Sequence, residues 1–183
     1  GVRPGLIKLG IEGEPLSATE RKVLHAGART HRETGLVIAA HTGPWAQVEP
    51  GRNARCAFAQ LDLLEGVGVE PSAWIWVHAQ NEVQGDEHVR AARRGAWVSF
   101  DGFRPGQEAA YVAMIGRMRD EGFLERVLVS QDAGWYNAGQ PRGGEFNPFH
   151  PIFTLLIPAL RQHGFDESQL GMLFRHNPAR AFA

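Results

Sequence analysis

Five short apolar segments of this chain each lead into a polar or charged residue, and this pattern constrains the fold more than any other feature of the sequence. The five polar residues, in chain order, are Lys8, His41, His78, Asp101 and Asp132. Each segment has the length and the β-branched and aromatic content of a buried strand. Parallel α/β proteins carry their chemistry at the carboxyl ends of the strands. We therefore expect these five side chains to converge on one face.

The strands recur at the interval of a repeated strand and helix. They are expected at residues 5–9, 36–42, 74–78, 96–101 and 127–132. From Lys8 to Asp132 the mean interval is about 31 residues, which is the repeat of a (β/α)₈ barrel of roughly 250 residues. The sequence therefore predicts an α/β protein with the TIM-barrel fold. An open five-stranded sheet is the alternative, and the polar residues at the strand ends argue against it.

Helix signals separate the strands. The clearest is the capping box Ser17-Ala18-Thr19-Glu20, which begins a helix, and Asn53 is expected to cap the next one. Helices are predicted up to residue 32 and over residues 53–64, 86–94, 108–119, 152–162 and 167–174, with a last turn from residue 177.

A single domain is expected over residues 1–183, as the C-terminal part of a longer protein. Gly1 precedes the first strand almost directly. A parallel barrel needs about eight strands to close, and five are evident. The chain is therefore expected to supply strands 4–8 of the barrel, with strands 1–3 absent from this sequence.

Composition excludes several classes of function. A net charge of −1 argues against a nucleic-acid or anionic-membrane partner. No run of about 18 apolar residues predicts a transmembrane helix. The single Cys56 excludes an intrachain disulfide and fits a reducing, cytoplasmic compartment. Its place in a helical pattern indicates a small buried residue rather than a nucleophile.

Lys8 lies among Leu6, Ile7 and Leu9, where an ammonium group is costly to bury. Four interpretations remain open. Lys8 is a Schiff-base amine, a salt-bridge partner, a modified metal ligand, or a residue whose head reaches solvent between strand and helix.

His41 and His78 end successive strands, and Asp132 ends the fifth, where a buried carboxylate needs a cation. Two imidazoles and a carboxylate suit Zn²⁺, Mn²⁺, Co²⁺ or Fe. Asp101 precedes Gly102, and a turn role is as well supported there as a catalytic one. The other histidines are interpreted as surface or structural residues: His25, His31, His88, His150, His163 and His176.

Residues 134–150 form a long segment rich in Gly, Asn and Pro that contains Trp135, Tyr136, Phe146 and Phe149. Loops longer than about 12–15 residues are usually functional or disordered. Aromatic side chains here either cover a substrate at the mouth of the barrel or pack over its rim, and the sequence favours neither.

The chain resembles the phosphotriesterase family of the amidohydrolase superfamily over essentially its whole length. The matching pieces are Gly5-Leu6-Ile7-Lys8, His41-Thr42-Gly43, Val77-His78-Ala79-Gln80, Val98-Ser99-Phe100-Asp101, Ser130-Gln131-Asp132-Ala133-Gly134-Trp135 and Asn177-Pro178-Ala179-Arg180. The order and spacing of Lys, His, His and Asp carry most of this resemblance.

The resemblance implies a binuclear metal centre, most simply of zinc, with Co, Mn or Fe as alternatives. Lys8 matches a lysine that CO₂ converts into a bridging carboxylate, and His41 and His78 match the ligands of the more exposed metal. Asp132 matches a ligand of the buried metal that also accepts a proton. A metal-bridging hydroxide then attacks an ester, lactone or phosphotriester. The family resemblance also suggests a homodimer.

Substrate contacts are expected from the same family resemblance and from the aromatic residues. Asp101 and Arg104 resemble the lactonase branch, while Phe103, Trp135 and Tyr136 would form an apolar pocket for a hydrophobic small molecule. The sequence departs from the family in one respect, because the His-x-His pair of strand one is absent from it.

Three other functions are alternatives to the hydrolase. If the metal site is incomplete, the alternative is a non-catalytic protein that binds small apolar ligands on the same barrel. A metal-dependent nuclease would need a basic face and a glutamate in place of Lys8. A Schiff-base lyase would use Lys8 as its amine.

Overall fold

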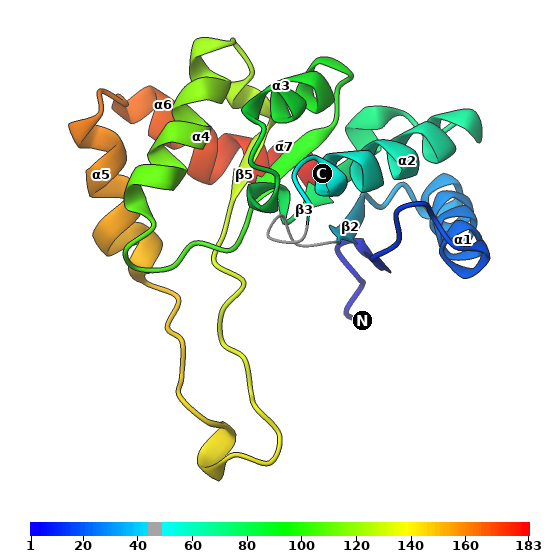
Figure 1. Ribbon diagram of the computed structural model, residues 1–183, viewed down its shortest axis with the longest axis horizontal. Coiled ribbons are helices and arrows are strands. Elements are labelled where there is room, and N and C mark those ends of the chain that lie inside the picture. Colours follow the sequence, from blue (N-terminus) through cyan, green and yellow to red (C-terminus); the bar gives the residue numbers. More distant parts are fainter. Residues whose placement is uncertain (44–48) are drawn as a thin grey trace.

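The computed structural model describes residues 1–43 and 49–183, and these residues form a parallel five-stranded sheet (Figure 1). The strands are β1 (Ile7–Ile11), β2 (Ile38–Thr42), β3 (Trp74–Val77), β4 (Trp97–Phe100) and β5 (Val127–Val129). They pair in chain order, so each strand lies beside the next one in the sequence. This is the order that consecutive βα units of a barrel produce.

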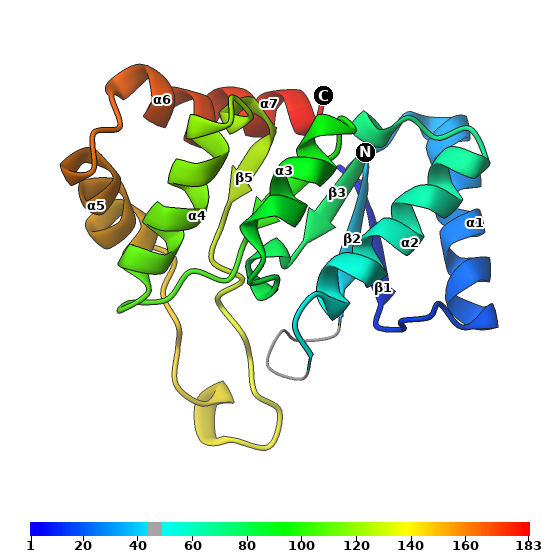
Figure 2. The same ribbon diagram turned by 45° about the horizontal axis from the view of Figure 1, so that its top comes forward.

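Helices connect the strands, and α1 to α4 cover one face of the sheet (Figure 2). The α-helices are α1 (Ala18–Thr34), α2 (Arg52–Gly66), α3 (Gly85–Arg93), α4 (Glu108–Asp120), α5 (Ile157–Gln162), α6 (Glu167–Gly171) and α7 (Asn177–Ala181). Short 3₁₀ turns are η1 (Pro71–Ala73), η2 (Ala79–Asn81), η3 (Leu124–Arg126) and η4 (Pro141–Gly143). No helix in the described part of the chain is long and apolar enough to span a membrane.

The alternation of side chains along each strand divides the apolar residues into two clusters. The larger cluster joins the helices to the outward residues of the strands, including Leu9 and Ile11 of β1. The smaller cluster lies on the inner face and comprises Val37, Ala39, Ile75, Trp97, Leu128 and Ala181. In β1, Lys8 pairs with Ala39 and Gly10 pairs with His41, so these residues share the inner face.

Three strands end earlier than the sequence predicted. Strands β3 and β4 stop one residue before His78 and Asp101, and β5 stops three residues before Asp132. His78 and Asp132 have φ values of 65° and 44°, which a continuing strand does not allow. Strand β1 differs in the opposite sense, because it continues through Ile11 and leaves Lys8 near its start.

The prediction that Asn53 caps the second helix is wrong. Helix α2 begins at Arg52 after Gly51, whose φ of 78° suits a glycine. Asn53 is buried, and its amide nitrogen donates to the Thr42 carbonyl over 2.8 Å. Its oxygen accepts from Trp76 Nε1 over 3.0 Å. Asn53 therefore ties α2 to β2 and β3.

Two of the helices expected near the C-terminus begin or end as π-helix. Residues 152–162 divide into η5 (Ile152–Leu156) and α5, and α6 is followed by η6 (Met172–His176). Each π-helical segment is followed within two residues by a proline, Pro158 or Pro178. Proline has no N–H to continue an i→i−4 ladder, so the hydrogen-bond pattern changes there.

Glu20 fixes the segment that connects β1 to α1. The capping box is confirmed: Ser17 accepts from Glu20 N, and the Glu20 carboxylate accepts from Ser17 N over 2.8 Å. The carboxylate also accepts from Glu12 N over 2.8 Å and from Gly13 N over 2.6 Å. Partial burial opposes ionisation of this group. The hydrogen bonds from Ser17, Glu12 and Gly13 outweigh it and lower the pKa of Glu20 to about 2.

The Glu20→Gln variant should therefore lose stability in a pH-dependent way. A carboxyl group whose pKa falls from 4.5 to about 2 on folding stabilises the fold above pH 4.5 and loses this effect as the pH falls toward 2. We expect a deficit of about 1 kcal/mol at pH 7, discounted for solvent screening, that closes over this acid range. Chemical denaturation from pH 2 to 7 measures it, with Glu33→Gln on the same helix as the control. A deficit independent of pH would contradict this account.

Candidate functional site

A cavity of about 480 Å³ lies on the inner face of the sheet. Four predicted metal ligands line it: Lys8, His41, His78 and Asp132. Asp101 and Trp135 line it too, together with apolar residues of the strands and Pro178 and Phe182 near the C-terminus. The structure thus brings all five polar residues of the strand ends to one cavity, as the sequence predicted.

The two imidazoles are neighbours at the centre of this arrangement. The ring centroids of His41 and His78 are 4.5 Å apart, and the rings meet edge to face at 82°. His41 Nε2 lies 2.7 Å from a carboxylate oxygen of Glu12. Burial lowers the pKa of His41, and the positive charge of His78 lowers it further, against the opposing effect of Glu12.

Asp101 holds His78 through both its ring and its backbone. One carboxylate oxygen lies 2.6 Å from His78 Nδ1, and the other accepts from His78 N over 3.0 Å. Gln80 completes the contact, since its amide nitrogen donates to Asp101 over 3.2 Å and its oxygen accepts from Asp101 N over 3.0 Å. Burial tends to lower the pKa of His78, but the hydrogen bond and charge of Asp101 raise it overall.

These contacts explain the left-handed backbone of His78. A residue other than glycine at φ 65° is uncommon and persists where the surroundings hold it. The Asp101 carboxylate provides that hold, because it accepts from the backbone and the ring of the same residue. Asp101 is buried, and the structure shows its contact with His78. Its role in substrate binding stays a prediction.

Asp132 was expected to be buried, whereas the sequence left open whether the head of Lys8 is buried or reaches solvent. Both side chains are exposed at the cavity in this five-stranded sheet, so the expectation for Asp132 is not met in the described chain. Lys8 Nζ donates to the Leu9 carbonyl over 3.1 Å. Partial burial still lowers the pKa of Lys8, while the charges of Asp101 and Asp132 oppose that change. Lys8 thus lies within electrostatic reach of both carboxylates.

Arg104 is anchored to the backbone around Asp132. Its guanidinium donates to the Asp132 carbonyl over 2.8 Å, to the Phe103 carbonyl over 3.0 Å and to the Gln131 carbonyl. These bonds span the segment in which Asp132 takes its positive φ. Arg104 was predicted to bind substrate, and in this structure it holds the segment that carries Asp132.

The expected apolar pocket of Phe103, Trp135 and Tyr136 does not form as predicted. Phe103 is 1% exposed and packs in the core with its ring 5.2 Å from that of Tyr111. Tyr136 is 75% exposed and is not among the cavity-lining residues. Trp135 alone of the three lines the cavity, and its indole N–H donates to the Asp132 carbonyl over 2.8 Å.

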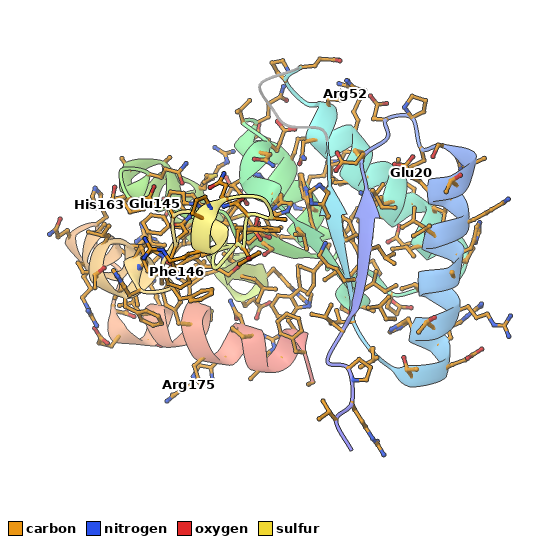
Figure 3. All side chains as sticks on the ribbon, turned by 90° about the horizontal axis from the view of Figure 1, so that it is seen from below. Glu20, Arg52, Glu145, Phe146, His163 and Arg175 are labelled. Carbon is orange, nitrogen blue, oxygen red and sulfur yellow. The ribbon has the colours of Figure 1, made fainter. Side chains whose placement is uncertain are left out.

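The loop after β5 extends away from the body of the protein (Figure 1). Gln131 joins its two ends, since its amide nitrogen donates to the Phe149 carbonyl and its oxygen accepts from Ile152 N over 3.1 Å. Glu145 and Phe146 lie on this loop (Figure 3). Phe146 and Phe149 are 64% and 57% exposed, and their ring centroids are 6.0 Å apart.

Sequence reasoning missed Glu12, Gln80 and Gln131. Glu12 follows Leu9-Gly10-Ile11, where apolar alternation continues past Lys8 and marks the real end of β1. The two glutamines follow a strand end within three residues, but nothing in their local pattern shows that they would bond to Asp101 and Phe149. Cys56 was interpreted correctly: it is buried, and burial raises the pKa of its thiol to about 12.

His41 and His78 fit the part of a metal site that two imidazoles supply. The rings are neighbours in one cavity, and imidazole nitrogen is a ligand that Zn²⁺ accepts. Across residues 1–43 and 49–183, no three His, Cys, Asp or Glu side chains are grouped to hold one metal ion. The described donors therefore do not by themselves form a closed metal site.

The fold and the cavity define a barrel of the phosphotriesterase type. The model of the phosphotriesterase family matches residues 1–182, and the chain therefore belongs to this family. The chain is 29% identical over 187 residues to the phosphotriesterase homology protein of Escherichia coli, with 99% of this chain and 60% of that protein covered. It is 27% identical over 193 residues to human N-acetyltaurine hydrolase, covering 94% of this chain and 52% of that one.

Solved structures agree with the family and with the barrel fold. A lactonase from Listeria monocytogenes superposes with a TM-score of 0.81 at 28% identity, covering 98% of this chain and 54% of that one. An organophosphorus hydrolase from Deinococcus radiodurans gives a TM-score of 0.78 at 27% identity, with 100% and 56% covered. The predicted fold is thus confirmed, and the chain spans little more than half the length of these relatives.

Replacing Arg104 by Met should loosen the segment that carries Asp132. The variant keeps an apolar stem but loses the hydrogen bonds to three backbone carbonyls, a loss of about 1–3 kcal/mol. Hydrogen exchange followed by mass spectrometry should show faster exchange over residues 131–136. Arg142→Met, an exposed arginine of the same loop, is the control and should leave this segment unchanged. Equal exchange in the Arg104 variant and the wild type would show that the segment is held by other contacts.

Proposed function

We propose that this chain forms the C-terminal part of a metal-dependent hydrolase that cleaves an ester, lactone or phosphotriester of a hydrophobic small molecule. The observation that carries the proposal is the convergence of Lys8, His41, His78 and Asp132 on one cavity, in a chain of the phosphotriesterase family. Relatives named as a lactonase and an organophosphorus hydrolase support the substrate class.

Two divalent metal ions, most simply Zn²⁺, are the proposed cofactors, with Co, Mn or Fe as alternatives. His41 and His78 would hold one ion, Asp132 would ligate the other, and a carboxylated Lys8 would bridge them. When bound, the ions would supply an ionised water near pH 7 and polarise the bond to be cleaved. The lowered pKa of Lys8 supports carboxylation, because only the neutral amine adds CO₂, with loss of a proton.

The residues of the chain divide the remaining tasks. The Asp132 carboxylate is exposed at the cavity, where it can accept the proton that the attacking water loses. Arg104 fixes the backbone from which this carboxylate extends. Trp135 and the apolar strand residues form the wall against which a hydrophobic substrate would lie.

One observation favours a second function, the binding of a small apolar ligand without catalysis. The described residues do not form a complete metal site, yet the cavity wall includes Leu6, Ile75 and Leu128. Such a wall can hold an apolar molecule through burial alone. The metal content of the protein separates the two functions.

Lys8→Ala should lower metal content and activity together. The variant loses the proposed bridging carboxylate, so elemental analysis should find less zinc per chain, and hydrolysis of a lactone should fall by at least tenfold. Added acetate should restore part of both, because it can supply a carboxylate in the vacated space. Lys22→Ala on α1 is the matched control, and Lys22 is exposed. Unchanged metal content and activity in Lys8→Ala would remove Lys8 from the site.

Asp132→Asn tests the proposed proton acceptor. The amide keeps the size of the side chain but cannot take up a proton, so turnover should fall by 10²-fold or more, the low end for a lost general base. Zinc-loaded protein would be assayed with a lactone, an aryl ester, a phosphotriester and an N-acyl amide. A rate near that of the wild type on the preferred substrate would rule out this role. An N-acyl amide as the preferred substrate would replace the proposed ester class.

A further inference from the structure

Glu12 is the first residue after β1, and its carboxylate reaches the imidazole of His41 on the neighbouring strand. The Glu12 oxygen and His41 Nε2 are 2.7 Å apart, with the imidazole 21% exposed and the Glu12 side chain 65% exposed. An ionised carboxylate only accepts hydrogen bonds, so the proton of this contact belongs to the imidazole. We infer that Glu12 is a positioning residue that fixes the His41 ring in the tautomer with its proton on Nε2 and its lone pair on Nδ1.

The backbone of Glu12 is fixed from both sides. Its N–H donates to the Glu20 carboxylate over 2.8 Å. The carbonyl of the preceding Ile11 accepts from Gly43 N over 2.8 Å, which extends the pairing of β1 with β2. Figure 3 shows Glu20 on the side toward which the β1 arrow points. The Glu12 side chain therefore starts from a point held by α1 and by β2.

Gly43 leaves the space in which the Glu12 side chain lies. A Cβ atom at position 43 would approach the Glu12 carboxylate closer than real atoms do, and it would lie 3.0 Å from Glu12 Cα. The backbone of Glu12 cannot move away easily, because Glu20 and β2 hold it. His41, Gly43 and Glu12 thus form one unit in which the glycine allows the carboxylate to reach the ring.

The neighbouring imidazole of His78 is also in contact with a carboxylate, but through the other ring nitrogen. Asp101 lies 2.6 Å from His78 Nδ1, whereas Glu12 lies against His41 Nε2. Each ring is thereby oriented by its own carboxylate, and the two rings meet edge to face. A carboxylate that sets ring tautomer and orientation is a common support for a metal-ligating histidine. That the Glu12 carboxylate supports metal binding by His41 rests on the proposed function. The tautomer of the His41 ring does not depend on that function.

The test is the ring tautomer of His41 in the chelator-treated, ¹⁵N-labelled 183-residue chain. Long-range ¹H–¹⁵N spectra at about pH 8.5, well above the ordinary imidazole pKa of about 6.5, separate protonated from unprotonated ring nitrogens. The His41→Gln variant assigns the signals. Glu12→Ala, Glu12→Gln and Gly43→Ala test the carboxylate and its space. Glu14→Ala is the control, since Glu14 pairs with Arg55 over 3.2 Å in the same segment.

The wild type should show the proton on Nε2. In Glu12→Ala the two ring-nitrogen signals should move toward each other, because both tautomers become populated, and Gly43→Ala should shift them in the same direction. Glu12→Gln keeps an accepting oxygen and should preserve the wild-type pattern, as should Glu14→Ala. A wild-type ring protonated on Nδ1, or an unchanged pattern in a folded Glu12→Ala, would overturn the inference.

The inference and the proposed function can fail separately. The tautomer is measured without metal, whereas a zinc titration of the same sample asks whether the His41 and His78 signals respond to the ion. A fixed Nε2 proton without any response to zinc would contradict the metal-dependent function and leave the role of Glu12 in place. A response to zinc with a tautomer independent of Glu12 would contradict the role of Glu12 and leave the metal-dependent function in place.

Discussion

Parallel pairing in register is the constraint on which the rest of this structure depends. Because side chains alternate along a strand, one register sends Leu9 and Ile11 toward the helices and Lys8 toward the inner face. The same register places Lys8 and His41 on that face of adjoining strands. A slip of one residue would bury the polar side chains under the helices and expose the apolar ones. The hydrophobic core and the candidate site therefore stabilise the same pairing.

Polar contacts between the ends of neighbouring strands then turn this shared face into an ordered site. Asp101 orients the ring and backbone of His78, and Glu12 lies against the ring of His41. Arg104 binds the backbone from which Asp132 extends. None of these contacts lies between residues adjacent in sequence, so each depends on the folded sheet. The site is accordingly a product of the tertiary structure and not of any local motif.

The fold and the location of the site could be predicted from the sequence, and much of the detail could not. The repeat of apolar segments predicted the order of the strands. The capping box of Ser17 and Glu20 could be predicted because both partners lie within one helical turn. The exposure of Asp132 in the described chain was not predicted, because burial on the inner face depends on how far the sheet closes and not on the local sequence. The roles of Arg104 and Phe103 depend on contacts in the folded chain with Asp132 and Tyr111, which no local pattern encodes.

The central claim is that His41 and His78 together bind a metal ion at the carboxyl ends of the strands. Crystals of the chain grown with Zn²⁺ and measured on both sides of the zinc absorption edge would test it most directly. The account predicts an anomalous peak at about 2.0–2.1 Å from one nitrogen of each ring. Rings in their present positions with zinc bound only elsewhere on the protein would contradict it.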